Sequence, residues 1–127
     1  MQGLDIIGEV VTTGPKMTFE STTVDYGTLE QHGEPLRVCT FTNTGTEPLV
    51  IKNARGSCGC TVPIWPKEPI MPGESSQIEI RYATNRLGKF SKTVTLTTNE
   101  VGEQHTLKVM GEVLKPETES VPTSTPT

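Results

Sequence analysis

Hydrophobic and polar residues alternate along most of this chain, and the alternation predicts β-strands. Ile78, Ile80 and Tyr82 alternate with polar neighbours, and Val94 and Leu96 do the same further along the chain. Successive side chains of a strand point to opposite faces, so each of these sets shares one face. We therefore expect one face of each strand to point into a hydrophobic core.

Further runs repeat this pattern, whereas no long window keeps the 3.6-residue period of an amphipathic helix. The inward sets expected in these runs are Leu107, Val109, Gly111 and Val113, then Cys39, Phe41 and Asn43, and then Leu49 and Ile51. The segment from Met17 to Tyr26 predicts an edge strand that is split around Thr22. Residues 4–11 are a candidate extra strand.

Turn residues separate the runs at short intervals. The segments 43–48, 69–74, 85–88 and 99–103 are rich in Gly, Pro and Asn. Pro72 presets its own φ and Gly73 is free to take a positive φ, as a tight turn requires. About seven short strands with such turns predict an all-β, immunoglobulin-like β-sandwich. Trp65 follows the cysteine pair at 58 and 60, so the Cys…Trp…Cys core of antibody domains is absent from the pattern.

The length of 127 residues fits one domain. We assign residues 17–114 to the sandwich and residues 1–16 to an N-terminal extension or edge strand. Residues 115–127 consist mostly of Pro, Thr, Ser and Glu, which have little to bury, and we expect a disordered tail there.

Charge and motifs exclude several classes of function. The net charge is −4, so no basic excess exists to bind a nucleic-acid backbone. Apolar runs stay far below the roughly 20 residues of a membrane-spanning helix, and we expect no membrane insertion. The sequence has no Gly-rich phosphate loop, no calcium loop and no Gly-x-Ser-x-Gly elbow. We therefore expect no enzyme activity and no cofactor.

Cys58-Gly59-Cys60 is the sharpest local feature, and three interpretations remain open. The thiols are packed as small hydrophobes, or they take part in a structural disulfide, or they are active in thiol exchange or metal binding. For a structural disulfide, Cys39 with Cys58 or Cys60 is the bridge to test. A bridge between Cys58 and Cys60 would close a very small ring that is readily reduced. Arg55 lies near enough in sequence to lower a thiol pKa.

Other candidate residues give weaker signals. His32 is expected to be a solvated loop residue and His105 an exposed strand residue, and three Cys with two His at irregular spacing make a poor zinc site. Trp65 either caps one end of the sandwich or anchors a partner. The candidate functional loop comprises Arg55, Ser57, Cys58, Gly59, Cys60, Thr61 and Trp65.

Several motifs together resemble the signature of an uncharacterised bacterial family. They are Phe41-Thr42-Asn43-Thr44-Gly45, Pro48-Leu49-Val50-Ile51, Ser57-Cys58-Gly59-Cys60-Thr61-Val62-Pro63, Pro72-Gly73-Glu74 and Gly88-Lys89-Phe90-Ser91-Lys92-Thr93. This family is grouped with Hydin-like (ASH) immunoglobulin-like domains, whose fold is similar to pilus chaperones and major sperm protein. The resemblance covers residues 19–113. It implies an exported or lipid-anchored protein, although the first residues, Met1-Gln2-Gly3-Leu4-Asp5, do not form an export signal.

These observations favour a non-catalytic immunoglobulin-like binding or spacer module of the bacterial cell envelope. An unknown protein or glycan would bind by strand addition at an open sheet edge, or at the loop from Arg55 to Pro69. One alternative is a thiol-redox or metal-handling protein acting through Cys58 and Cys60. A second is a periplasmic chaperone-like domain, for which Lys52 and Arg55 are candidate anchors. We expect a periplasmic or cell-surface location, with the cytoplasm as the alternative.

Overall fold

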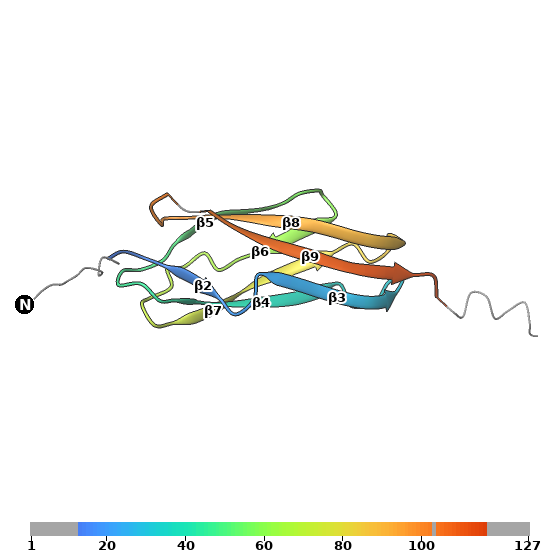
Figure 1. The fold of residues 1–127 in the computed structure, drawn as a ribbon, viewed down its shortest axis with the longest axis horizontal. Helices are drawn as coiled ribbons and strands as arrows, with labels where there is room; N and C mark the ends of the chain where they lie inside the picture. Colours follow the sequence, from blue (N-terminus) through green and yellow to red (C-terminus); the bar gives the residue numbers. More distant parts are fainter. Residues whose placement is uncertain (1–12, 103, 117–127) are drawn as a thin grey trace, which may run out of the picture.

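Two β-sheets packed face to face form the fold of the described part of the chain, residues 13–102 and 104–116 of a computed structural model (Figure 1). The strands are β2 (Met17–Phe19), β3 (Thr23–Glu30), β4 (Leu36–Asn43), β5 (Ile51–Gly56), β6 (Thr61–Ile64), β7 (Ser75–Tyr82), β8 (Gly88–Thr98) and β9 (Gln104–Leu114). The prediction of an all-β, immunoglobulin-like sandwich is confirmed, with eight described strands in place of about seven.

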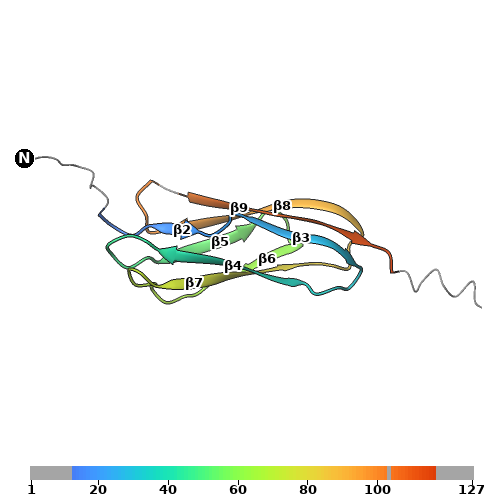
Figure 2. The same cartoon turned by 60° about the horizontal axis from the view of Figure 1, so that its bottom comes forward.

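The first sheet has the strand order β2-β4-β7-β6 and the second has the order β3-β9-β8-β5. Neighbouring strands are antiparallel, except that β3 and β9 run parallel. The sandwich is elongated, and β2 begins at one end of its long axis while β9 finishes at the other (Figures 1 and 2). The described residues contain no helix that is long and apolar enough to cross a membrane.

The first segment of the chain changes sheets at Ser21. The N–H of Glu20 still donates to Thr40 O of β4 at 3.2 Å, whereas Thr22 O already accepts the N–H of Lys108 of β9 at 2.8 Å. The sequence predicted a split of this segment around Thr22 but placed both halves in one edge strand. In the structure, β2 and β3 belong to different sheets, and this crossover produces the parallel pairing of β3 with β9.

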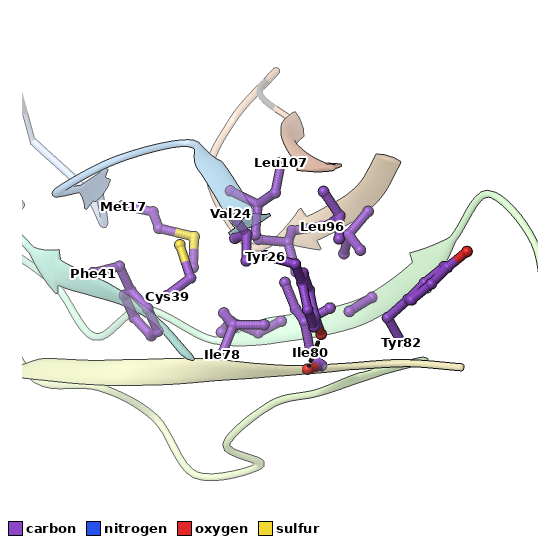
Figure 3. Packing of buried hydrophobic residues seen from close by; sticks show 14 of the residues in the cluster. Met17, Val24, Tyr26, Cys39, Phe41, Ile78, Ile80, Tyr82, Leu96 and Leu107 are labelled. Carbon is purple, nitrogen blue, oxygen red and sulfur yellow. Dashed lines mark hydrogen bonds between the residues drawn. The ribbon is translucent and has the colours of Figure 1, made fainter. Parts of the chain in front are cut away.

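The core lies between the two sheets, and most of its side chains are those that the alternation placed inward, with Met17, Ala54, Ile70 and Phe90 in addition (Figure 3). Fully buried side chains come from both sheets and include Phe41, Ile78, Ile80, Val94, Leu96, Leu107, Val109 and Val113. Leu49 is also buried but lies outside the strands and forms an isolated bridge with Ile70. The candidate strand at 4–11 and residues 117–127 of the tail lie outside the described residues.

Aromatic rings fill one part of the core. The Tyr26 hydroxyl lies within hydrogen-bonding distance of Pro35 O (2.7 Å) and Ile80 O (3.0 Å, Figure 3), so this buried polar group is satisfied. Burial raises the pKa of Tyr26 above its ordinary value of 10.0. Gly111 lies beneath these rings, and a Cβ there would come within 2.7 Å of Tyr26 Cβ and 2.8 Å of Phe90 Cζ. Tyr26 and Phe90 therefore leave no room for a side chain at position 111.

Candidate functional site

The connection between β5 and β6 carries the cysteine pair and passes from one sheet to the other. Ser57 fixes its start: the Ser57 N–H donates to Thr93 O at 2.8 Å, and Ser57 Oγ accepts the Thr93 N–H at 3.1 Å. Gly56 lies so close to Thr61 that a Cβ at position 56 would overlap the Thr61 carbonyl oxygen. Gly59 has open space around its Cβ position and no positive φ, so its backbone does not require glycine.

Cys58 and Cys60 form a disulfide at the tip of this connection, and both residues are half-buried. The Cys60 N–H donates to Cys58 Sγ at 3.2 Å. Thr61 Oγ1 lies 3.8 Å from Cys58 Sγ and 3.7 Å from Cys60 Sγ, and Thr61 is itself buried. Cys58 Sγ therefore has one N–H donor, and the two sulfur atoms share the neighbouring Thr61 hydroxyl.

Cys39 is a free, buried cysteine, and the bridge expected between Cys39 and Cys58 or Cys60 is not the one in the structure. Its Sγ lies 3.2 Å from Ser21 O, at the crossover between the sheets. Cys39 pairs with Ile78 of β7, whereas Cys60 O accepts the N–H of Ala83. Ile78 and Ala83, the residue that follows β7, are roughly 16 Å apart at 3.3 Å per residue, and a disulfide needs Cα atoms within about 7 Å. Burial raises the pKa of the Cys39 thiol.

A cavity of about 390 Å³ lies beside the disulfide. Its lining includes Cys60, Val62, His32 and Arg81, and none of the lining residues is acidic. His32 is exposed in the turn after β3 and has a φ of 68°, in the left-handed region. The sequence predicted a loop position for His32 but gave no sign that this loop faces Cys60, because the two residues are far apart along the chain.

Trp65 lies beside a second hollow of about 550 Å³ on the outer face of the first sheet. Ile64, Trp65 and Pro66 line one side, and Glu79 is the one charged residue in the lining. Trp65 also packs partly against the core, and Lys67 Nζ lies 3.3 Å from the centre of its ring. Trp65 thus contacts the core and also borders a hollow on the surface, and its role as an anchor for a partner stays a prediction.

The same hollow borders an unpaired stretch of the β7 edge. The Tyr82 N–H donates to Pro35 O at 3.0 Å, so even-numbered residues of β7 pair with the β4 side and odd-numbered residues point the other way. On that other side β6 reaches only as far as Glu79. Ser75 and Gln77 therefore direct their backbone N–H and C=O groups to an edge where no described residue supplies a strand partner.

The remaining candidates are spread over the molecule. Lys52 and Arg55 are exposed on β5, which belongs to the other sheet from β6 and β7. No cluster of three or more metal-ligating side chains occurs among the described residues. The candidate loop of the sequence analysis is thus divided: Arg55 lies on β5, the disulfide borders one cavity and Trp65 borders another.

Sequence reasoning missed the contact between Glu100 and His105. His105 was expected to be exposed, but its side chain is 18% exposed and its Nε2 lies 2.8 Å from Glu100 Oε1. Glu100 is buried in the turn between β8 and β9, and no sequence pattern indicated an altered pKa for it. Burial raises its pKa, but hydrogen bonds from Thr98, Met17 and His105 outweigh burial and leave the pKa below 4.5.

Comparison with solved structures places the fold among immunoglobulin-like domains. A Porphyromonas gingivalis protein of unknown function matches at 17% identity and a TM-score of 0.67, over 87% of this chain and 53% of its own. This chain thus spans about half the length of that protein. The human CEP192 ASH/PapD-like domain matches at 12% identity and TM-score 0.61, over 89% and 96% of the two chains.

A chaperone and tip-adhesin complex of Acinetobacter baumannii Csu pili matches at 11% identity and TM-score 0.56, over 87% of this chain and 66% of that one. Two Vibrio cholerae proteases match over smaller shares of their own chains, 31% and 25%, so this fold also occurs within enzymes. These similarities establish an immunoglobulin-like fold of the ASH and PapD type, as the sequence predicted. No curated protein matches the sequence.

A family match covers residues 17–113, which is nearly the whole of the described sandwich. The family is described as a protein of unknown function, DUF1573. The resemblance to an uncharacterised family with ASH-like relatives is thereby confirmed at the level of family and fold. On this match, the chain belongs to the DUF1573 family of proteins of unknown function.

Proposed function

We propose that this protein is a non-catalytic, immunoglobulin-like binding module that takes an extended segment of a partner protein along the open edge of β7. The observation that carries the proposal is the unpaired ladder at Ser75 and Gln77 beside the hollow that Trp65 lines. An added strand would supply the missing backbone partners, and alternate side chains of that strand would enter the hollow.

The surroundings of the edge favour a peptide with apolar and basic residues. Val38 and Ile64 both pair with Glu79 in register, so these three side chains form a row across the outer face. Val38 is 49% exposed and Ile64 is 45% exposed. The row therefore offers apolar contacts on both sides of one carboxylate, which complements a lysine or arginine flanked by apolar groups.

A bacterial envelope location is part of the proposal. Support comes from the Cys58–Cys60 disulfide, because disulfides persist mainly in oxidising compartments such as the periplasm. Further support comes from the similarity in fold to a complex of a pilus chaperone with a tip-adhesin subunit. A chaperone-like role is a variant of the same proposal, since it also rests on binding a protein segment.

The test is selection of binding peptides from a random 12-residue library, followed by amide NMR of the complex. We expect the selected peptides to change the amide signals of Ser75 and Gln77, and Trp65→Ala to weaken binding about tenfold or more. Leu87→Ala is the matched control, because it also removes an exposed apolar side chain but lies between β7 and β8, outside both the lining of the hollow and the row of Val38, Glu79 and Ile64.

Full binding by Trp65→Ala, or peptides that leave the Ser75 and Gln77 amides unchanged, would contradict the proposal. Binding of glycans from an array with unchanged β7 amides would instead favour a glycan-binding module. Gln77→Pro gives an independent check, since it removes an N–H that has no described partner and so blocks strand addition without breaking the sheet ladder.

A further inference from the structure

We propose that the Cys58–Cys60 disulfide is an exchange site that oxidises a pair of thiols in a client protein. This activity goes beyond peptide binding at β7 and uses a different cavity. The observations are the disulfide itself, the half-buried position of both cysteines, and the cavity of about 390 Å³ that Cys60 lines.

The position of this bond in the chain makes it easy to exchange. Only Gly59 separates the two cysteines, so the bond restrains almost none of the unfolded chain. Loop-closure stabilisation grows with the number of residues enclosed, and folding therefore protects this bond far less than a bridge between distant strands. Both cysteines are half-buried residues and Cys60 lines the cavity, which gives an incoming thiolate a route to the bond.

The two sulfur atoms have different surroundings, which assigns a direction to the exchange. Cys60 lines the cavity together with Arg81 and His32. No carboxylate lines this cavity, so no negative charge there repels an approaching thiolate. Cys58 Sγ accepts the Cys60 N–H at 3.2 Å, whereas the Thr61 hydroxyl lies at similar distances from Cys58 Sγ (3.8 Å) and Cys60 Sγ (3.7 Å). The Cys60 N–H therefore stabilises a thiolate on Cys58, so Cys60 is the sulfur attacked and Cys58 is the leaving group.

The exchange balances with the client dithiol as the only co-reactant. A client thiolate attacks Cys60 Sγ, the Cys58–Cys60 bond breaks, and its electron pair leaves on Cys58. The second client thiol then loses its proton to solvent and attacks the client sulfur of the mixed disulfide, which releases Cys60 as a thiolate. The client gains one disulfide and loses two electrons and two protons, while Cys58 and Cys60 become a dithiol.

The first experiment locates the sulfur that is attacked. Folded protein is incubated with reduced glutathione, quenched with acid and mapped by peptide mass spectrometry. We expect glutathione on Cys60 and a free thiol on Cys58, with Cys39 unmodified because it is buried. Untreated protein with three free thiols, or glutathione found equally on Cys58 and Cys60, would overturn the proposal.

The second experiment measures the exchange rate with dithiothreitol, which attacks as a thiolate anion, under native conditions. Arg81→Glu should slow the reaction by about tenfold, since it replaces a cation of the cavity by an anion. Arg86→Glu is the matched control, because it changes net charge equally at an exposed position outside the cavity lining. Equal rates for the two variants, or a bond that reacts only after unfolding, would contradict the exchange site.

A final arm separates this inference from the proposed peptide binding. The oxidised protein is mixed with one equivalent of a synthetic peptide that carries two thiols, and the oxidised peptide is quantified. We expect wild type and Trp65→Ala to transfer the disulfide equally, since Trp65 lines the other hollow. Failure of transfer by both proteins would reject the exchange site and leave peptide binding at β7 unaffected.

Discussion

Glu100 Oε2 accepts a hydrogen bond from the backbone N–H of Met17 at 2.9 Å, although 83 residues separate the two positions. The bond joins the first described strand to the turn between β8 and β9. The same carboxylate accepts the Thr98 hydroxyl at 2.6 Å and contacts His105 Nε2 at 2.8 Å. One buried acid therefore holds both sheets together at this end of the sandwich.

This arrangement predicts a specific loss of stability in acid. The pKa of Glu100 is lower in the folded protein than its ordinary value of 4.5. Its contribution is then fully present above pH 4.5 and is lost as the pH falls through the folded pKa. Glu100→Gln should lower the free energy of unfolding at pH 7 by about 1.5–3 kcal/mol, since it replaces an ionised acceptor in buried hydrogen bonds.

The measurement is urea unfolding at a series of pH values from 7 down to about 3, a window set by the ordinary pKa of glutamate. The difference in stability between wild type and Glu100→Gln should shrink as the pH falls below 4.5. Glu47→Gln serves as the control, because Glu47 is exposed and its side chain has no described partner. A constant difference across the series would contradict the role assigned to Glu100.

We expect the loss of the Asn43 side-chain amide to destabilise the protein strongly. The Asn43 side chain is fully buried, and Nδ2 donates to Glu47 O and Ile70 O at 2.8 Å each. Its Oδ1 accepts hydrogen bonds from the backbone N–H groups of Lys16 and Gly45. Asn43→Ala should cost about 3 kcal/mol in thermal or urea unfolding, because it leaves several buried groups without partners. Asn53→Ala, at an exposed position, should change stability by less than about 0.5 kcal/mol.

Asn43→Asp tests separately how much the two amide donors of Asn43 contribute to stability. A carboxylate of equal size cannot donate to the two carbonyl oxygens, so this variant should be no more stable than Asn43→Ala at pH 7. A stable Asn43→Asp protein would show that the amide donors contribute little.

The two glycines of the cysteine loop should respond in opposite ways. Gly56→Ala places a methyl group on the Thr61 carbonyl, so we expect a loss of about 1–3 kcal/mol in urea unfolding. Gly59→Ala meets open space and an ordinary backbone conformation, and it should be neutral or stabilise the protein by up to about 1 kcal/mol. Comparable destabilisation by both substitutions would mean that the loop needs glycine at position 59 as well.

Because of Tyr26, we expect the folded protein to lose stability at alkaline pH. Its pKa is raised by burial, so its contribution is present below pH 10.0 and is lost as the pH rises through the folded pKa. Tyr26→Phe should lower stability at pH 7 by about 1 kcal/mol, since it removes the buried hydroxyl together with its hydrogen bonding to the carbonyl oxygens of Pro35 and Ile80. Tyr82→Phe is the control, because no described hydrogen bond involves the Tyr82 hydroxyl.

The alternation of side chains predicted the strands and their inward faces because period two is a local property of the sequence. Cys39 was placed on the inward face correctly, and so was Gly111, whose Cβ position faces Tyr26 and Phe90. The positive φ of Gly73 followed from the turn chemistry. These features depend on neighbouring residues only, so a single sequence carries enough information to predict them.

Features that depend on long-range register could not be predicted in this way. The crossover at Ser21 requires knowing that two different sheets flank the segment. The cysteine pairing depends on how far Cys39 lies from Cys60 in space, and the Glu100–His105 contact depends on the fold of the β8–β9 turn. The open edge at Gln77 arises because β6 is shorter than β7, which the sequence pattern does not reveal.

The parallel pairing of β3 with β9 has a mechanical consequence. Since β2 begins at one end of the long axis and β9 finishes at the other, tension applied across these ends drags β3 and β9 past each other lengthwise (Figure 1). In such shear, the backbone hydrogen bonds between β3 and β9 share the load and must break together, whereas peeling the strands apart would break them one after another. Because the crossover at Ser21 creates this parallel pairing, a force along the long axis acts on the whole β3–β9 ladder at once.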